Sequence, residues 1–355
     1  MKITVILLLS ALLVSCGGHG NVNSLGAGSP AATGETVIVA GGNQFATFTQ
    51  LKSGAVTQAP GSPIAAVGAT TACTTDPSNA FILVAYDNST VVSYRINSDS
   101  TATTVTTGLT TAPVNAIAEV GGRFAYLAEN SGTFTQFGVF SLTATGTLQG
   151  LPNQLTDAPA LDLIGHPTAP VLIASEDPQA LQAFSIDATT GQPVPLTLPF
   201  TGFGGANFQS MTFAQQGAFL LVAEGTQPNF PVDVLTVNPA TGVFTPLGTS
   251  LNVPGSFMLV THPNQSIVYA LSANSITPLA IDTRGFLVIS VPATPLPAGF
   301  TPTAAAIDNT GTNLYVTGSN GALIAFAVNP TTGVLTAAPV STTTLNFTPV
   351  CVFVK

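Results

Sequence analysis

Positive charge is the scarcest property of this sequence. Only 6 of its 355 residues are Lys or Arg, against 15 Asp or Glu, so the formal net charge is −9 at pH 7. Proteins that bind nucleic acids neutralise phosphates with clustered Lys and Arg side chains. No such cluster occurs here, which excludes a nucleic-acid-binding function. Charged residues make up 6% of the chain, and the Thr, Ser, Asn and Gln that replace them suit an exported protein.

Long apolar runs are also absent, with one exception at the start of the chain. Lys2 is followed by an apolar run over residues 3–14, which is too short to span a bilayer as a stable anchor. A basic residue followed by such a run is typical of a secretory signal peptide, which we place at residues 1–15. Beyond it no stretch of about 18 apolar residues occurs, so no other segment is expected to cross a membrane.

The signal ends in the phrase LVSC (13–16), which resembles the lipobox of bacterial lipoproteins. The resemblance implies cleavage before Cys16 and lipidation of its thiol; an ordinary signal peptide with a chance cysteine is the alternative. Gly17 follows rather than Asp, which by the same resemblance favours the outer membrane. We therefore expect an exported bacterial protein that is lipid-anchored to the cell envelope, with residues 16–35 as a flexible tether.

Residues 36–355 repeat themselves seven times with a period of about 46 residues. Each copy contains a β-rich apolar run that ends in a small residue, as in TVIVAGG (36–42) and FLLVAEG (219–225). Such a period is typical of β-propellers, in which each repeat forms one blade of four antiparallel strands. Aligning the runs places these residues at equivalent positions: Ala40, Ala85, Ala128, Ala174, Ala223, Ala270 and Thr317.

A second repeated phrase predicts the turn between the outer two strands of each blade. IDATTG (186–191), VNPATG (237–242) and VNPTTG (328–333) open with Asp or Asn and end with Gly, which accepts the positive φ of a tight turn. Both markers have the same period. The sequence therefore predicts an all-β fold, a single seven-bladed β-propeller of four-stranded antiparallel blades over residues 36–355. The turn residues are Gly54, Ser100, Gly146, Gly191, Gly242, Gly285 and Gly333.

The two ends of the repeated region predict how the ring closes. The first copy begins with the second strand of its blade and has no first strand of its own. The segment FTPVCVFVK (347–355) follows the last copy and aligns with PTAAAID (302–308), the first strand of the seventh blade. We therefore expect the C-terminal strand to pair into the N-terminal blade, which removes an open sheet edge.

The hairpin phrases FSIDATTGQPVPL, LTVNPATGVFTPL and FAVNPTTGVLTAA resemble those of the bacterial lactonase family of seven-bladed propellers, which includes the 6-phosphogluconolactonase-like proteins. The resemblance covers residues 36–355. It implies the propeller fold, and it implies hydrolysis of a sugar lactone in some members and a non-enzymatic surface role in others. The family pattern often has Asn and then an acidic residue after the second strand. Here Glu129 and Glu224 fill the acidic position, but Ala128 and Ala223 stand in place of Asn.

The predicted ring separates its charges, because the Lys and Arg side chains lie toward one face and an acidic group lies on the other. Like charge repels an anionic substrate. This disfavours a phosphosugar lactone and leaves a neutral sugar lactone, with Glu129 or Glu224 as the catalytic base. The acidic face carries Asp87, Glu129, Asp157, Glu176, Asp177 and Glu224.

The same acidic side chains suggest a cation site as an alternative. Ca²⁺ prefers several hard oxygen ligands. No Asp-x-Asp-x-Asp-Gly loop occurs, so we expect a solvated acidic face with no metal and no other cofactor. The candidate cation ligands are Asp87, Glu129, Glu176, Asp177 and Glu224.

Other catalytic motifs are absent. The sequence has no Gly-x-Ser-x-Gly elbow and no glycine-rich phosphate loop. His19 lies in the tether, whereas His166 and His262 both precede Pro between predicted first and second strands, which indicates a structural role in turns. With no third histidine nearby, a zinc site is not expected.

Two cysteines remain after Cys16, and they lie on predicted first strands of neighbouring blades. A disulfide between Cys73 and Cys351 would join the closing strand to the second blade. The alignment puts the two cysteines one residue out of register, which favours two buried free thiols over a bridge.

Two functions from different classes remain open. The sparse catalytic inventory favours a binding or interaction scaffold on the cell envelope, which presents its loops to a protein or glycan and touches the membrane through its lipid anchor only. The alternative is a lactonase-like hydrolase. One fold hosts many functions, so the fold by itself does not decide whether this protein is an enzyme.

Overall fold

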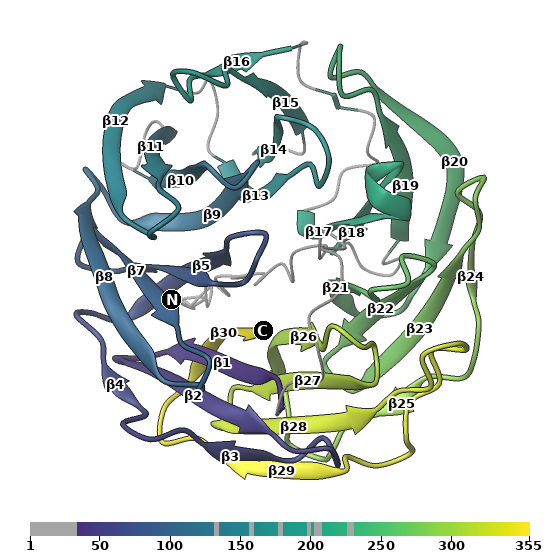
Figure 1. Cartoon of the computed structure of the whole chain (residues 1–355). Coiled ribbons are helices and arrows are strands. Elements are labelled where there is room, and N and C mark those ends of the chain that lie inside the picture. Colours follow the sequence, from purple (N-terminus) through teal and green to yellow (C-terminus); the bar gives the residue numbers. More distant parts are fainter. Residues whose placement is uncertain are drawn as a thin grey trace, which may run out of the picture.

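The fold is a ring of seven antiparallel sheets around a central axis (Figure 1). Each sheet contains a path of four strands, which confirms the predicted seven-bladed all-β propeller. In the described part of the chain no helix is long and apolar enough to cross a membrane. Residues 1–33, with the expected signal peptide and most of the tether, lie outside the described residues. A computed structural model describes residues 34–130, 135–155, 160–176, 180–196, 200–201, 208–225 and 231–355.

We number the blades 1 to 7 in the order of their second strands along the chain. The inner strands lie nearest the axis (Figure 1). They are β30 (Pro349–Val354), β5 (Thr70–Thr75), β9 (Val114–Val120), β13 (Ala160–Gly165), β17 (Phe208–Ala214), β21 (Ser256–Thr261) and β26 (Pro302–Ile307). The second strands are β1 (Thr36–Gly41), β6 (Phe81–Tyr86), β10 (Phe124–Asn130), β14 (Val171–Glu176), β18 (Phe219–Glu224), β22 (Ile267–Ser272) and β27 (Asn313–Gly318).

The remaining strands complete each blade toward the rim of the ring. The third strands are β2 (Gln44–Gln50), β7 (Thr90–Ile96), β11 (Thr135–Leu142), β15 (Ala180–Ile186), β19 (Pro231–Val237), β23 (Ser275–Ile281) and β28 (Ala322–Ala327). The outer strands are β3 (Val56–Gln58), β8 (Ala102–Leu109), β12 (Leu148–Leu155), β16 (Pro193–Pro195), β20 (Phe244–Asn252), β24 (Leu287–Ile289) and β29 (Ser341–Thr344). Short strands β4 (Ile64–Ala65) and β25 (Thr294–Pro295) pair with β2 and β23, and one 3-10 turn, η1 (Gln215–Gly217), precedes β18.

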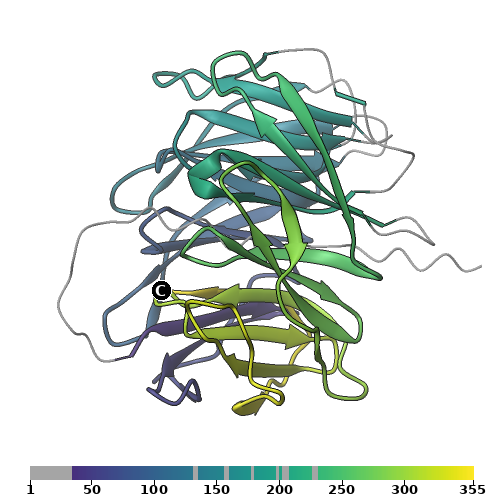
Figure 2. The same ribbon diagram turned by 90° about the vertical axis from the view of Figure 1, so that its right-hand side faces the viewer.

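The ring has two faces, which we name by what they carry. The turn face carries the turns between first and second strands and between third and outer strands, such as residues 76–80 and 97–101. The link face carries the turns between second and third strands and the links between blades, such as residues 87–89 and 110–113. Figure 2 shows the ring from the side, with the C-terminus, which lies on the turn face, marked.

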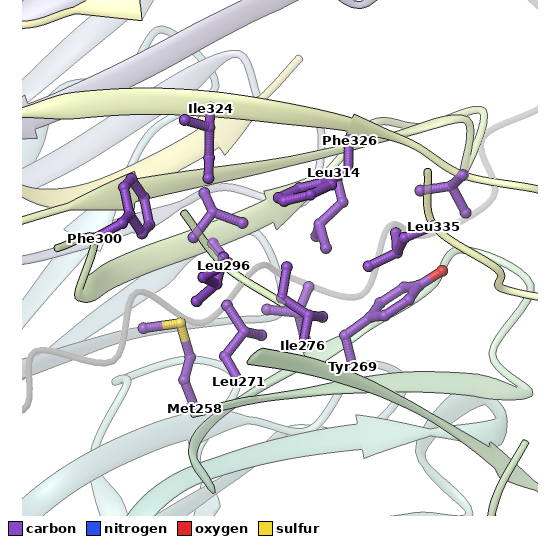
Figure 3. Packing of buried hydrophobic residues seen from close by; sticks show 14 of the residues in the cluster. Met258, Tyr269, Leu271, Ile276, Leu296, Phe300, Leu314, Ile324, Phe326 and Leu335 are labelled. Atoms are coloured by element: carbon purple, nitrogen blue, oxygen red, sulfur yellow. The ribbon is translucent and has the colours of Figure 1, made fainter. Parts of the chain in front are cut away.

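Each blade buries both of its faces against its two neighbours. The buried apolar side chains of the described residues form seven clusters, and each cluster lies between two adjacent blades. Figure 3 shows the cluster between blades 6 and 7, where Leu271 and Ile276 of blade 6 meet Leu314 and Phe326 of blade 7. Because both faces are covered, the second strands are continuous apolar runs and not alternating ones.

The ring closes as predicted, through the C-terminal strand. Strand β30 pairs antiparallel with β1, with Cys351 opposite Ala40 and Val354 opposite Val37. Blade 1 therefore takes its inner strand from one end of the chain and its other strands from the other end. The edge of β1 that faces the axis is therefore paired, and blade 1 has the same four-strand path as the other blades.

A disulfide joins Cys73 to Cys351, with their Cα atoms 6.2 Å apart. The expectation of two free thiols is therefore wrong. The one-residue offset was noted correctly, but adjacent blades present opposite faces to each other. Ala72 belongs to the cluster between blades 2 and 3, whereas Cys73 and Cys351 belong to the cluster between blades 1 and 2. Side chains that meet across a blade interface must be offset by an odd number of residues, so the offset permits the bridge.

Two structural features explain why the turn residue recurs in every blade. All seven have a positive φ, from 64° at Ser100 to 84° at Gly146, as the turn pattern predicts. Each turn also reaches the preceding blade. The hydroxyl of Tyr126 donates a hydrogen bond to the carbonyl of Gly191 over 2.8 Å, and Tyr269 and Tyr315 do the same to the equivalent glycines of the next blades. The turn phrase therefore marks a contact between blades as well as a local bend.

His166 and His262 have the structural role expected for them. In each imidazole, Nδ1 accepts a hydrogen bond from the backbone N–H of the residue two positions later in the same turn. Nε2 of His262 bonds the carbonyl of Gly311 in the next blade over 3.0 Å, and His166 bonds the backbone of Gly217 in the same way. Burial lowers the pKa of both side chains, which keeps them neutral and suited to these bonds.

We expect Cys351→Ser to lower the free energy of unfolding by about 2–4 kcal/mol, because the bridge restricts a very long stretch of the unfolded chain. Urea unfolding with and without a thiol reductant measures the effect. The reduced wild type should unfold at the midpoint of the variant. An oxidised wild type that unfolds together with the variant would show that the two thiols are not bonded.

The turn glycines allow a matched test of the contact between blades. A Cβ at Gly146 would lie 2.2 Å from the ring of Phe81, whereas a Cβ at Gly248, also at positive φ, meets no atom within 4 Å. Both Gly→Ala changes cost about 1–2 kcal/mol of left-handed backbone strain. We expect Gly146→Ala to cost about 1–3 kcal/mol more from overpacking. Equal losses in denaturant unfolding would refute the contact.

Candidate functional site

Three glutamates occupy equivalent positions at the ends of second strands in three consecutive blades. In each blade the glutamate lies at the point where the pairing between the inner and second strands shifts by one residue; the three are Glu129, Glu176 and Glu224. All three side chains are buried, at 1%, 3% and 3% exposure. They lie at the link-face end of their strands. The structure thus gives blade 4 the same acidic position as blades 3 and 5.

The pairing between first and second strands corrects the sequence alignment of the blades at two positions. In blade 4 the residue before the register shift is Ser175 and not Ala174. In blade 6 it is Leu271 and not Ala270. The reason is that backbone hydrogen bonding, and not the size of a side chain, fixes which residues of two strands face each other.

Glu129 is held in place by hydrogen bonds. Its Oε2 accepts from the backbone N–H of Thr111 over 3.0 Å, from the Thr111 hydroxyl, and from the side-chain amide of Gln136 over 3.0 Å. Its other oxygen, Oε1, lies against Gly138, only 2.1 Å from the point that a Cβ on that residue would occupy. Glu129 therefore fixes the link between blades 2 and 3. A carboxylate engaged in this way is a weak candidate for a catalytic base.

Glu224 has a different environment. Its Oε1 is buried with no hydrogen-bond partner in the described structure. Strand pairing puts Asp233 of β19 opposite Val222, two residues before Glu224 and on the same face of the sheet, and the two carboxyl groups share a hydrogen bond. The hydroxyl of Ser250 on β20 donates to Asp233. These residues form a row across the second, third and outer strands of blade 5, and we call Glu224 and Asp233 the acid pair.

Burial, followed by the hydrogen bond and the negative charge of Asp233, raises the pKa of Glu224 to about 8. At neutral pH Glu224 is therefore a protonated carboxylic acid beside a carboxylate. Such a pair can give a proton from one side and accept one on the other. Sequence reasoning found Glu224 but missed Asp233, because a single acidic residue inside a third strand belongs to no motif.

The other acidic candidates do not join this pair. Asp87 is exposed on blade 2, where its Oδ1 accepts from the backbone N–H of Ala69 over 2.9 Å. Asp157 and Asp177 lie outside the described residues. Within the described ranges no group of three His, Cys, Asp or Glu side chains could hold a metal ion. The described candidate cation ligands, from Asp87 to Glu224, are thus spread over four blades and not gathered into one site.

The predicted separation of charge is only partly present. The basic side chains do belong to the turn face, which also carries several carboxyl groups. Burial raises the pKa of Glu119 on that face to about 8, and burial with the charge of Asp308 raises the pKa of Glu35 to about 7. The Lys and Arg residues at this face are Lys52, Arg95, Arg123, Arg284 and Lys355.

No protein-family model and no curated protein matches this sequence. Solved structures do match its fold. A candidate 6-phosphogluconolactonase from Bacteroides uniformis is 16% identical over 91% of this chain and 100% of its own, with a TM-score of 0.76. The periplasmic gluconolactonase of Pseudomonas aeruginosa is 15% identical over 90% of this chain and 98% of its own, with a TM-score of 0.74.

The chain has the fold of the 6-phosphogluconolactonase-like propellers. A further candidate 6-phosphogluconolactonase, from Bacteroides fragilis, is 17% identical over 93% of this chain and 100% of its own, with a TM-score of 0.72. The resemblance drawn from the hairpin phrases is thereby confirmed for the fold. Function has to be argued from the acid pair itself.

The raised pKa of Glu224 predicts how stability depends on pH. A carboxyl whose pKa rises from 4.5 to about 8 on folding contributes its full stability below about pH 4.5 and loses it as the pH rises through about 8. We expect the free energy of unfolding of Glu224→Gln to fall less than that of the wild type between about pH 5 and about pH 9. Asp87→Asn, which removes an exposed carboxyl group on the same face, is the control for the loss of one negative charge. Parallel curves for all three proteins would contradict the assignment.

Proposed function

We propose that this propeller hydrolyses a neutral lactone and that the acid pair performs the proton transfers. The supporting observation is a buried carboxylic acid, Glu224, with one unpartnered oxygen beside the carboxylate of Asp233. A perturbed carboxyl next to a specific charged partner favours a functional site. The solved structures with this fold include a protein named as a gluconolactonase, which supports the same reaction class.

The chemistry of lactone opening matches what the two carboxyl groups can do. Water must lose a proton as its oxygen attacks the carbonyl carbon, and the ring oxygen must gain a proton as its bond to that carbon breaks. Asp233 accepts the proton of water, and Glu224 gives its own proton to the ring oxygen. A proton then passes from Asp233 to Glu224, which restores the pair. The product is an open-chain hydroxy acid.

The protonated state of Glu224 has a second use in this reaction. Negative charge develops on the substrate as water adds, and a neutral acid beside it exerts no repulsion on that charge. A carboxylate in the same place would repel that charge. The pKa of about 8 therefore keeps Glu224 in its useful form at neutral pH.

The charges near the acid pair favour an uncharged substrate. Glu129, Glu176 and Asp87 lie at the same face of the ring, and the described Lys and Arg residues all belong to the opposite one. A phosphorylated lactone would meet carboxylates without a guanidinium or ammonium partner. We therefore propose a neutral sugar lactone or a related ester ring as the substrate.

An exported, lipid-anchored scaffold for a protein or glycan is the second proposal. Its support is the long outer strand β8, whose free edge faces outward and exposes Thr103, Thr104 and Thr107. Hydroxyl groups on such an edge can hydrogen-bond a glycan. This proposal becomes the leading one if the purified protein opens no lactone.

We expect Asp233→Asn and Glu224→Gln each to lower kcat for a neutral lactone by roughly 10²–10⁴, the usual contribution of an acid or base group. Asp87→Asn should keep the wild-type rate. The wild-type rate should fall above about pH 8, where Glu224 loses its proton. The assay uses the purified full-length protein with a panel of neutral lactones, with and without added Ca²⁺. No turnover above buffer would overturn the proposal.

A further inference from the structure

The turn face differs between the two halves of the ring. Directly after the turn glycine, blades 5, 6 and 7 carry Val243, Phe286 and Val334, which are 47%, 52% and 42% exposed. The turn of blade 1 exposes Leu51 to 46%. The equivalent residues of blades 2, 3 and 4 are polar: Thr101, Thr147 and Gln192.

We call Leu51, Val243, Phe286 and Val334 the apolar arc, because they occupy the third-to-outer turns of four consecutive blades. Single exposed apolar residues are common on protein surfaces. Three of these side chains recur at one position in adjacent blades, directly after the turn glycine, and Leu51 lies in the same turn of the next blade, three residues before its glycine. Exposed apolar side chains that recur in the turns of adjacent blades favour a surface that meets a protein or a membrane.

Basic side chains accompany the apolar arc. Lys52 follows Leu51 in the same turn, and the guanidinium of Arg284 lies 5.0 Å from the ring centre of Phe286. The nearby carboxylate of Asp282 is paired with Arg284 over 2.9 Å. Long basic side chains beside apolar ones suit the boundary between lipid headgroups and acyl chains, because their stems bury while their charges reach the headgroups.

Two equivalent turns outside the apolar arc carry a carboxylate with no paired basic side chain described, unlike Asp282 of blade 6, which is paired with Arg284. Asp99 belongs to blade 2 and Asp187 to blade 4, where the turns are polar. Both accept hydrogen bonds from residues of their own turns, which lower the pKa of each carboxyl and keep it charged. The polar half of the turn face is thus the half that a bilayer would repel.

The described chain begins beside the apolar arc. The backbone N–H of Gln50 donates to the carbonyl of Glu35 over 2.7 Å, so Gly34 and Glu35 lie next to the turn that holds Leu51. Residues 17–33 separate Gly34 from Cys16, the expected site of lipidation. These residues, at about 5–6 Å times the square root of their number, give a separation of roughly 25 Å for a chain without fixed structure. A lipid on Cys16 would therefore hold this edge of the ring close to the membrane.

We propose that the apolar arc docks on the surface of a lipid bilayer, with the turn face toward the membrane. The link face, with Glu224 at the strand end of blade 5, then points to the solvent. This orientation goes beyond the proposed reaction and does not depend on it.

The chain contains no Trp, so the fluorescence of a single introduced Trp reports the surroundings of that residue alone. Phe286→Trp in the full-length protein puts one indole on the apolar arc. Leu109→Trp is the matched control, since Leu109 is 77% exposed at the link-face end of β8. Both proteins are bound to vesicles of phosphatidylethanolamine and phosphatidylglycerol whose acyl chains carry bromine, which quenches nearby Trp fluorescence.

We expect the Phe286→Trp protein to lose most of its fluorescence on brominated vesicles and the Leu109→Trp protein to keep it. Both variants carry the same N-terminal segment, so the difference reports orientation and not the anchor. Equal quenching of both reporters, or of neither, would overturn the proposal. A stable dimer by analytical ultracentrifugation, converted to monomer by Phe286→Ser, would overturn it as well by assigning the apolar arc to a second copy of the chain.

Discussion

The burial of every blade between two others is the constraint on which this structure depends. A sheet with both faces covered needs apolar side chains at successive positions, so the second strands are continuous apolar runs. It also needs each blade to offer one set of residues to the preceding blade and the alternate set to the next. The seven clusters between blades are the result, and each is built from strands of two different repeats. The order of the ring is therefore set by interfaces and not by any one blade.

The parts of the fold that sequence could predict are those with local causes. A continuous apolar run and a tight turn that ends in a residue of positive φ are each complete within a few residues, and both recur once per blade. Their common period was enough to predict the ring, its four-stranded blades and the closing strand at 347–355. The tyrosine contacts explain why the second marker is so regular: Gly191 has to fit both its own turn and Tyr126 of the preceding blade.

The errors came from features that depend on pairing across strands. Small residues suggested that Ala174 and Ala270 were equivalent to Ala128, but the hydrogen-bond register assigns that position to Ser175 and Leu271. The cysteine prediction failed because it compared equivalent positions, whereas two neighbouring blades meet through opposite faces. A sequence alignment of repeats describes one blade, and it does not describe the interface between two.

The candidate site shows the same limit. Glu129 and Glu224 are indistinguishable as sequence, since each follows an alanine at the end of an apolar run. What separates them is supplied by other strands: Thr111 and Gln136 satisfy Glu129, whereas Asp233 faces Glu224 and leaves one of its oxygens without a partner. The position could be predicted, but the chemistry of each carboxyl group could not.

The pairing of β30 with β1 also has a consequence for how the protein is made. Blade 1 contains the first strands of the repeated region to leave the ribosome, yet its inner strand is made after the strands of the other six blades. The inner edge of β1 therefore has no native partner until β30 has been made, and the bond between Cys73 and Cys351 cannot form earlier. A chain whose ring is completed by β30 keeps that ring open while the strands between β1 and β30 are made.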